Sequence, residues 1–177
     1  GVWNMQVQGN DEPGPIRMSV SSMIGIPIDL KFAIIDVQNR DVIMNFPQKE
    51  LIIENKIEDA YDVILIGGQE SYVLQMIDDI LADIPEEYSL GQNYPNPFNP
   101  TTKIDFALPR TGDVSLVIYN LMGQQVRTLL AKNMEYGFHT ITWNGLDQSG
   151  RPVSSGVYFS ELRARSFRQT KKMLMLK

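Results

Sequence analysis

Short segments in which apolar and polar residues alternate recur before residue 67. They lie at residues 3–8, 16–21, 30–37, 42–46, 51–54 and 61–66. Turn-forming stretches such as "NDEPGP" (10–15) and "QNRD" (38–41) separate them. Alternation with a period of two indicates strands with one buried face. So many short strands in succession are typical of a β-sandwich, which we predict for residues 1–71.

A helical period follows this first group of strands. The apolar residues recur at helical spacing until Pro85 ends the run: Val73, Ile77, Ile80, Leu81 and Ile84. Because the segment is short, we expect a connecting helix and not an element of the core. Together with the proline-rich stretch after it, this helix forms a predicted linker over residues 72–101.

The strand pattern returns at residue 102 and continues to the end of the chain. The expected strands are residues 102–108, 114–120, 124–130, 139–143, 157–165 and 169–177. The loops between them, such as "LMGQ", "EYGF" and "SSG", are mostly short enough for hairpins. We therefore predict a second sandwich over residues 102–177 and an all-β fold class for the whole chain.

The composition is that of a folded protein, with 43% hydrophobic and 21% charged residues among 177. The longest apolar runs fall short of the roughly 20 residues that span a bilayer, so we expect no transmembrane helix. The chain opens at Gly1 without a basic or apolar leader. We expect it to be a mature or truncated part of a longer precursor.

Most catalytic and metal-binding chemistry is hard to build from this composition. The chain has no Cys, which excludes disulfides, thiolate zinc sites and cysteine nucleophiles. Its single histidine, His139, alternates with Ile141 and Trp143 along a strand, where a packed or rim position is expected. Most metal sites need several convergent ligands. We therefore predict no enzyme activity, no metal and no cofactor.

Three weaker patterns favour ordinary structure over chemistry. "DQSGRP" (147–152) lacks the repeated oxygen ligands of a calcium loop, so a turn is expected. "GGQES" (67–71) has neither a P-loop lysine nor a full glycine fingerprint. The adjacent acids at 78–79 and 86–87 are expected to be solvated, because glycosidase carboxylates face each other across a cleft.

Charge divides the chain into two contrasting parts. Residues 1–84 hold 14 acids and 5 bases, a net charge of −9, and residues 85–177 hold 7 acids and 11 bases, a net charge of +4. This asymmetry supports two modules. No base-reading motif accompanies it, so we predict no nucleic-acid partner. The basic residues near the C terminus form either a solvated strand face or a patch for an anionic partner: Arg163, Arg165, Arg168, Lys171, Lys172 and Lys177.

The stretch "YPNPFNP" (94–100) precedes the second module. Its three prolines fix φ and remove three amide donors, so the stretch cannot be a central strand. It is stiff enough to act as a rigid boundary between the modules. We expect Tyr94 and Phe98 to pack against the second module, as aromatic anchors usually do.

Residues 88–177 carry a series of ordered motifs: "YPNPFNP", then "YNLMGQQV", then "WNGLDQSGRPVSSGVY", then a basic and apolar last strand. This series closely resembles the C-terminal sorting domain (type A) of proteins exported by the type IX secretion system. That domain is similar to the immunoglobulin-like domain of the flagellar hook-capping protein. The resemblance implies an immunoglobulin-like β-sandwich over residues 88–177 that is an address and anchor for secretion. With the sandwich predicted for residues 1–71, we expect two immunoglobulin-like β-sandwich modules in tandem.

The resemblance also implies the recognition residues and the partners. The sorting motif comprises Tyr94, Pro95, Asn96, Pro97, Phe98, Asn99, Pro100, Gly156, Val157, Tyr158, Lys171, Lys172 and Lys177. The implied partner is the outer-membrane secretion machinery, and the implied location is extracellular or at the cell surface. Deleting residues 169–177 should then block export.

Two other functions remain open from the sequence. The chain could be a subunit of a surface filament that assembles head to tail through strand addition or charge complementarity. Alternatively, the first module could be an adhesion or carbohydrate-binding module of a larger secreted enzyme, with a cell-surface polysaccharide as its partner.

Overall fold

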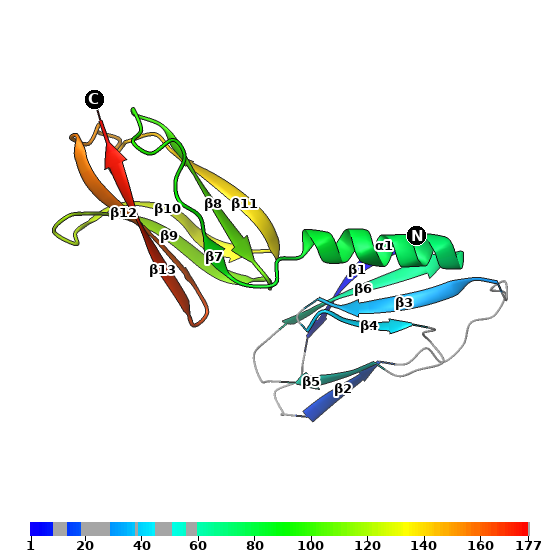
Figure 1. Cartoon of the computed structure of the whole chain (residues 1–177). Coiled ribbons are helices and arrows are strands. Elements are labelled where there is room, and N and C mark those ends of the chain that lie inside the picture. The colour runs from blue at the N-terminus through cyan, green and yellow to red at the C-terminus, as the bar shows by residue number, and fades with distance from the viewer. Residues whose placement is uncertain (9–13, 19–28, 38, 45–50, 56–59, 177) are drawn as a thin grey trace. The chain divides into compact units, whose positions relative to one another are not determined.

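The computed structural model describes residues 1–8, 14–18, 29–37, 39–44, 51–55 and 60–176. Strands predominate, in four antiparallel sheets with one helix, which confirms the all-β class (Figure 1). The chain divides into two compact units, residues 1–84 and 85–177. The segment predicted as a linker is shared between them, since its helix belongs to the first unit and its proline-rich stretch to the second. Residues 19–21 of the predicted strand 16–21, residues 45–46 of the predicted strand 42–46 and residues 10–13 of the predicted turn 10–15 lie outside the described residues.

The first unit contains a four-stranded antiparallel sheet in the order β1-β6-β3-β4. Its strands are β1 (Val2–Gln8), β3 (Lys31–Asp36), β4 (Asp41–Met44) and β6 (Ala60–Gly68). The central strands hold the buried aliphatic residues, with Ala33 paired to Ile66 and Ile35 to Ile64. A separate two-stranded sheet joins β2 (Gly14–Met18) to β5 (Leu51–Asn55).

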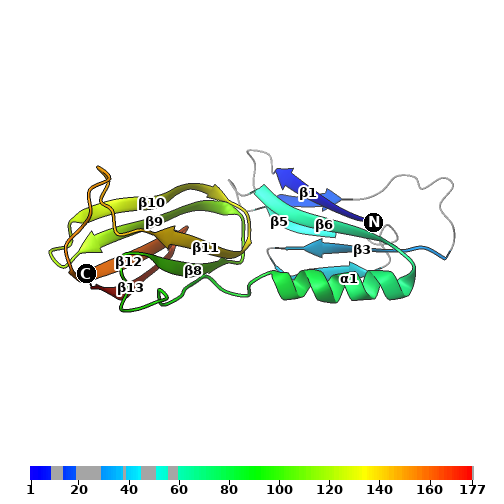
Figure 2. The same ribbon diagram turned by 90° about the horizontal axis from the view of Figure 1, so that it is seen from above.

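Helix α1 (Glu70–Asp83) begins two residues after β6 and packs on β3 and β6 (Figure 2). Val73 is completely buried and Ile77 is 8% exposed, so the helix is part of the core of this unit. The expectation of a mere connector was therefore wrong. The apolar spacing predicted a helix, but it did not show that a sheet face was available to bury that stripe.

The end of α1 is held by the hairpin between β3 and β4. The Arg40 guanidinium donates hydrogen bonds to the carbonyl oxygens of Ile84 and, at 3.1 Å, Leu81. The last carbonyls of a helix have no partner within the helix and carry partial negative charge, so a cation there is favourable. Asp36 fixes the hairpin by accepting from the backbone and side-chain nitrogens of Asn39 at 3.1 and 2.7 Å.

The second unit is a sandwich of two antiparallel sheets. One sheet has the order β10-β9-β12-β13 and the other the order β11-β8-β7. Their strands are β7 (Ser89–Leu90), β8 (Thr102–Leu108), β9 (Gly112–Asn120), β10 (Gln125–Met134), β11 (Gly137–Trp143), β12 (Gly156–Ala164) and β13 (Phe167–Met175). The sequence pattern predicted all of these except the two-residue β7.

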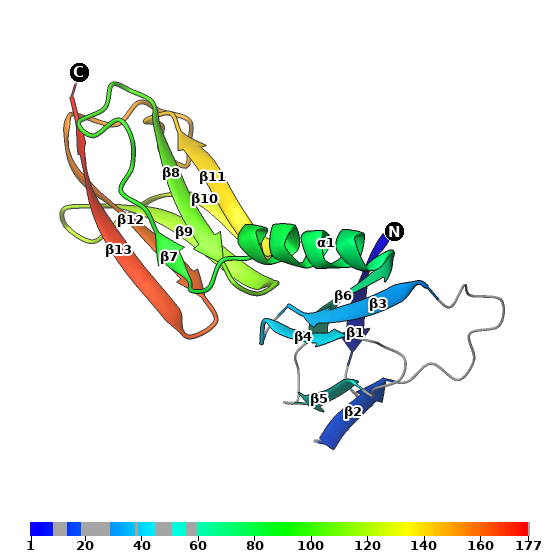
Figure 3. The same cartoon turned by 45° about the vertical axis from the view of Figure 1, so that its right-hand side comes forward.

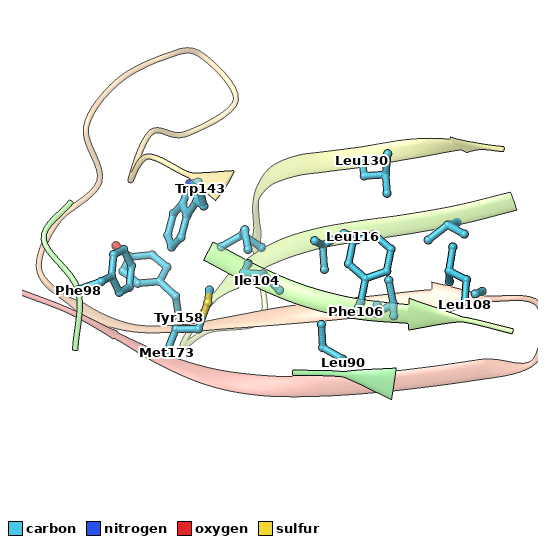
Figure 4. Close-up of a cluster of buried hydrophobic side chains, with 14 of the residues drawn as sticks. Leu90, Phe98, Ile104, Phe106, Leu108, Leu116, Leu130, Trp143, Tyr158 and Met173 are labelled. Atoms are coloured by element: carbon cyan, nitrogen blue, oxygen red, sulfur yellow. The ribbon is translucent and has the colours of Figure 1, made fainter. Parts of the chain in front are cut away.

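Alternate residues of both sheets meet in one apolar core (Figure 4). The inward row of β8 is Ile104, Phe106 and Leu108, and β9 contributes a row of Val114, Leu116 and Ile118. His139 lies beside this core, with its ring stacked on Phe106 at a centroid distance of 5.2 Å. The imidazole therefore has the packed position that the strand pattern predicts for it.

The burial of α1 generates a stability prediction. Ile77→Ala should lower the unfolding free energy of the first unit by roughly 2–5 kcal/mol, because it removes a buried aliphatic side chain. Leu74→Ala, on the same helix but 49% exposed, should change it by less than about 0.5 kcal/mol. Hydrogen exchange of β3 and β6 peptides measures both effects. Equal exchange in the two variants would show that α1 is not part of this core.

Candidate functional site

The proline-rich segment lies along the outer edge of the last strand. Phe98 donates its backbone N–H to the Leu174 carbonyl at 3.0 Å, and Leu176 donates to the Phe98 carbonyl at 2.9 Å. These two bonds form a parallel bridge at Met175. The prolines have no amide hydrogen to donate to β13. Phe98, which follows Pro97, makes the backbone contact instead.

Asparagine side chains add hydrogen bonds that hold this segment in place. Asn96 accepts from the Leu174 backbone N–H through its Oδ1 at 2.9 Å. Asn93 is buried and donates to Thr102 Oγ1 at 2.9 Å and to the Pro95 carbonyl at 3.0 Å. The sequence motif singled out Asn96 but missed Asn93. No local pattern marks Asn93, because its partner Thr102 lies nine residues away and is brought beside it by the fold.

The Phe98 side chain joins this segment to the core. It is 2% exposed and lies 5.4 Å from the Trp143 ring, which in turn meets Tyr158 edge-on at 5.2 Å (Figure 4). Met173 and Met175 of β13 are completely buried in the same cluster. The expectation that Phe98 packs on the second unit is therefore confirmed.

Tyr94 does not pack in this way, because its side chain is 79% exposed. Its backbone exchanges two hydrogen bonds of 2.9 Å with Lys103, which fixes this part of the chain as an extended segment. Successive side chains of an extended segment point to opposite sides. Because Asn93 points inward, Tyr94 points outward, and the predicted packing of its ring was wrong.

The segment before the prolines also follows β13. The Tyr88 and Phe167 rings stack at 5.4 Å, and the Leu90 N–H donates to Gln169 Oε1 at 2.8 Å. Gln92 then donates to the Lys172 carbonyl at 2.8 Å. Residues 88–98 thus flank the last strand from its beginning to its end.

The other motif segments lie at the same end of the sandwich as the proline-rich stretch. Gly156 pairs with Met175, and Tyr158 pairs with Asn120 at the end of β9. The C-terminal end of β13 lies beside the loop of residues 94–100 in both Figure 1 and Figure 3. Segments that are far apart in the sequence therefore form one surface, which we call the motif end: residues 94–100, 120–125, 144–158 and 174–176.

The hairpin of "YNLMGQQV" presents two apolar side chains at the motif end. Leu121 and Met122 are 73% and 78% exposed. The Asn120 side chain accepts from the backbone N–H groups of Met122 and Gln124 at 3.0 and 2.9 Å, and Gly123 takes a φ of 75°. The turn is therefore fixed by its own hydrogen bonds, and it holds two large apolar groups in solvent.

The loop after β11 is built around Asp147. Its carboxylate accepts from the backbone N–H groups of Ser149 and Arg151, both at 2.9 Å, and pairs with the Arg151 guanidinium at 3.0 Å. The Arg151 backbone hydrogen bond, aided by the other contacts, holds the pKa of Asp147 below its ordinary value. Both carboxylate oxygens thus serve the turn that the sequence favoured over a calcium loop.

The basic residues of the last hairpin are partly neutralised. Arg163 and Arg168 lie opposite each other on β12 and β13, and both pair with Glu161, at 2.6 and 2.7 Å. Burial raises the pKa of Glu161, but the hydrogen bonds from Arg168 and Arg163 outweigh it, so the pKa lies below its ordinary value. The Lys171 side chain is partly buried, Lys172 is exposed, and Lys177 lies outside the described residues.

Other candidate sites are separate from the motif end. A hollow of ≈ 430 Å³ lies over Ser115 and Ala131, near the turn between β12 and β13 at the opposite end of the sandwich.

In the described part of the chain no group of three or more His, Asp or Glu residues could hold a metal ion. No helix among those residues has the length and hydrophobicity needed to cross a membrane.

Residues 93–166 match the family of FlgD Ig-like domains. This match covers most of the second unit and less than half of the chain, and it agrees with the observed sandwich. The second unit therefore contains an immunoglobulin-like domain. No curated protein matches the sequence significantly.

Several solved structures show partial similarity, among them PorZ, FlgD and PorU. PorZ, a surface component of the type-IX secretion system of Porphyromonas gingivalis, is 18% identical with a TM-score of 0.36, over 52% of this chain and 12% of PorZ. FlgD from P. aeruginosa is 24% identical with a TM-score of 0.34, over 42% of this chain and 57% of FlgD. Dimeric latent PorU from Porphyromonas gingivalis is 11% identical with a TM-score of 0.41, over 99% of this chain and 18% of PorU. The alignments thus span between 12% and 57% of those proteins.

The aromatic cluster generates a second stability prediction. Phe98→Ala should lower the unfolding free energy of the second unit by roughly 3–5 kcal/mol, because it leaves a cavity beside Trp143. Tyr94→Ala should change it by less than about 0.5 kcal/mol. Urea unfolding in a Trp3→Phe background, which leaves Trp143 as the fluorescent reporter, compares them. A loss that is equally small in both variants would contradict the anchoring role of Phe98.

Proposed function

We propose that the second unit is a non-catalytic sorting module that the outer-membrane machinery of type IX secretion recognises in its folded form. The observation that supports this most is the assembly of the motif end. The segments that resemble the sorting domain are far apart in sequence, and they meet at one end of the sandwich. Receptor recognition is a natural reason for such segments to share a surface, because a receptor needs a defined arrangement of groups.

Exposed apolar side chains make the motif end suited to binding a protein. Besides Leu121 and Met122, it carries Tyr94 at 79% and Leu176 at 49% exposure. Grouped apolar residues on a soluble surface are a feature of protein interaction sites. Each of these four side chains lies on or next to backbone that is fixed by hydrogen bonds. The backbone therefore loses little conformational entropy when a partner binds.

This function places the chain outside the cell or on its surface, as part of an exported protein. The first unit is then a spacer between the sorting module and whatever precedes it. An adhesion role for the first unit stays a prediction. Head-to-tail assembly by strand addition to β13 is less favoured, because residues 88–98 already occupy the outer edge of that strand.

Deleting residues 169–177 is a poor test of recognition. The deletion removes Met173 and Met175 from the core and leaves Phe98 without its backbone partner. Loss of export would then reflect unfolding as well as loss of a binding surface. Substitutions of exposed residues separate the two effects, since such changes usually alter stability by less than about 0.5 kcal/mol.

We therefore predict that Leu121→Ser combined with Met122→Ser blocks export and leaves the fold intact. The chain is fused after a periplasmically targeted reporter in a bacterium with a type IX system, and reporter outside the cell is measured. The unchanged chain should be exported only when the secretion system is present, and the double variant should lose at least about tenfold. Leu74→Ser, an exposed apolar residue of the first unit, is the matched control. Normal export of the stably folded double variant would contradict recognition through this hairpin.

A further inference from the structure

The strands at the edges of the second unit are protected unequally. Edge strands present backbone N–H and C=O groups that can pair with another chain. Residues 88–98 flank β13, and β7 has only two residues. The β10 ladder shifts register twice, and Gln148 hydrogen-bonds to Val126 and Thr128 at its start. The remaining edge strand, β11, pairs with β8 in unbroken register over seven residues (Figure 3).

The backbone hydrogen bonds of β8 show which N–H and C=O groups of β11 point toward β8 and which point away from it. Lys103 exchanges backbone bonds with Tyr94, and Asp105 accepts from Gly91, so these residues of β8 face away from β11. The intervening residues of β8 therefore bond to His139 and Ile141. It follows that the backbone groups of the other β11 residues, Phe138, Thr140 and Thr142, point away from β8. Within the described chain no hydrogen bond reaches these outward backbone groups.

The side chains of β11 leave this edge without protection. Phe138 is 69% exposed, and Thr140 and Thr142 are exposed on the same face. Residues 137–143 contain no Lys, Arg, Asp, Glu or Pro. Natural edge strands usually carry such residues, bulges or a covering segment to prevent pairing with other strands. The contrast with the flanked β13 indicates that pairing is permitted at β11.

We propose that β11 pairs antiparallel with β11 of a second copy of this chain, with Thr140 on the two-fold axis. In this register Thr140 lies opposite Thr140 of the second copy, and Phe138 lies opposite Thr142. Threonine pairs and aromatic with β-branched pairs are favourable across strands. Because the strand has no charged residue, the symmetric pairing sets no like charges opposite each other. The two three-stranded sheets join into one sheet of six strands, and the dimer is closed.

The first test measures association of the full chain by sedimentation velocity over a concentration series. The unchanged chain should form a dimer as the concentration rises. Thr140→Pro removes an outward N–H that β8 does not use, so it should weaken the dimer by at least about tenfold while the unit stays folded. Thr140→Val keeps the N–H and should dimerise like the unchanged chain. A monomer at all concentrations, or equal dimerisation of the proline variant, would overturn the proposal.

The second test uses the absence of cysteine from the chain. Hydrogen-bonded antiparallel pairs place their Cα atoms about 5.5 Å apart, which suits a disulfide. Thr140→Cys should therefore cross-link to itself faster than Ser149→Cys, an exposed control in another loop. Phe138→Cys should cross-link to Thr142→Cys in a mixture, and each of these alone should not. Cross-linking of Thr140→Cys no faster than the control would overturn the proposed register.

Discussion

The contact between Phe98 and the last strand determines how the second unit is completed. The Phe98 backbone bonds to Leu174 and Leu176 on the outer edge of β13, and its ring enters the core beside Trp143. One residue thus supplies both the strand pairing and the apolar anchor of a segment whose prolines can supply neither amide bonds nor regular strand geometry. The proline-rich segment is therefore part of the domain as well as the boundary before it.

Two properties of the unit follow from this contact. The outer edge of β13 is flanked, and the strand addition that we propose is placed at β11, an edge strand of the other sheet. The proline-rich loop is also fixed beside the end of β13, which pairs with the strand that begins at Gly156, and that strand pairs in turn with Asn120 at the start of the Leu121 hairpin. The last strand thereby joins the proline-rich motif to the motif at Gly156.

The sequence predicted the strands well because alternation of apolar and polar residues survives in many of them, as in the inward row of Val114, Leu116 and Ile118. It missed β7, because two residues cannot show a period. It misjudged α1, since the spacing of Val73 and Ile77 reveals an apolar stripe but not the sheet that covers it. It assigned Tyr94 and Phe98 one role, although the direction of each side chain depends on a backbone partner outside the motif, Lys103 for Tyr94 and Leu174 for Phe98. The pairing of Glu161 with Arg163 and Arg168 was hidden for the same reason, since it depends on the register of two strands.

Backbone hydrogen exchange at the end of β13 tests most directly whether the proline-rich segment completes this strand. The amide of Leu176 donates to Phe98 and that of Leu174 to Asn96, whereas Met173 and Met175 face β12. Residue-resolved exchange in the full chain should show Leu174 and Leu176 protected to an extent similar to Met173. Exchange of Leu174 and Leu176 at the rate of free amides, with Met173 still protected, would contradict the account.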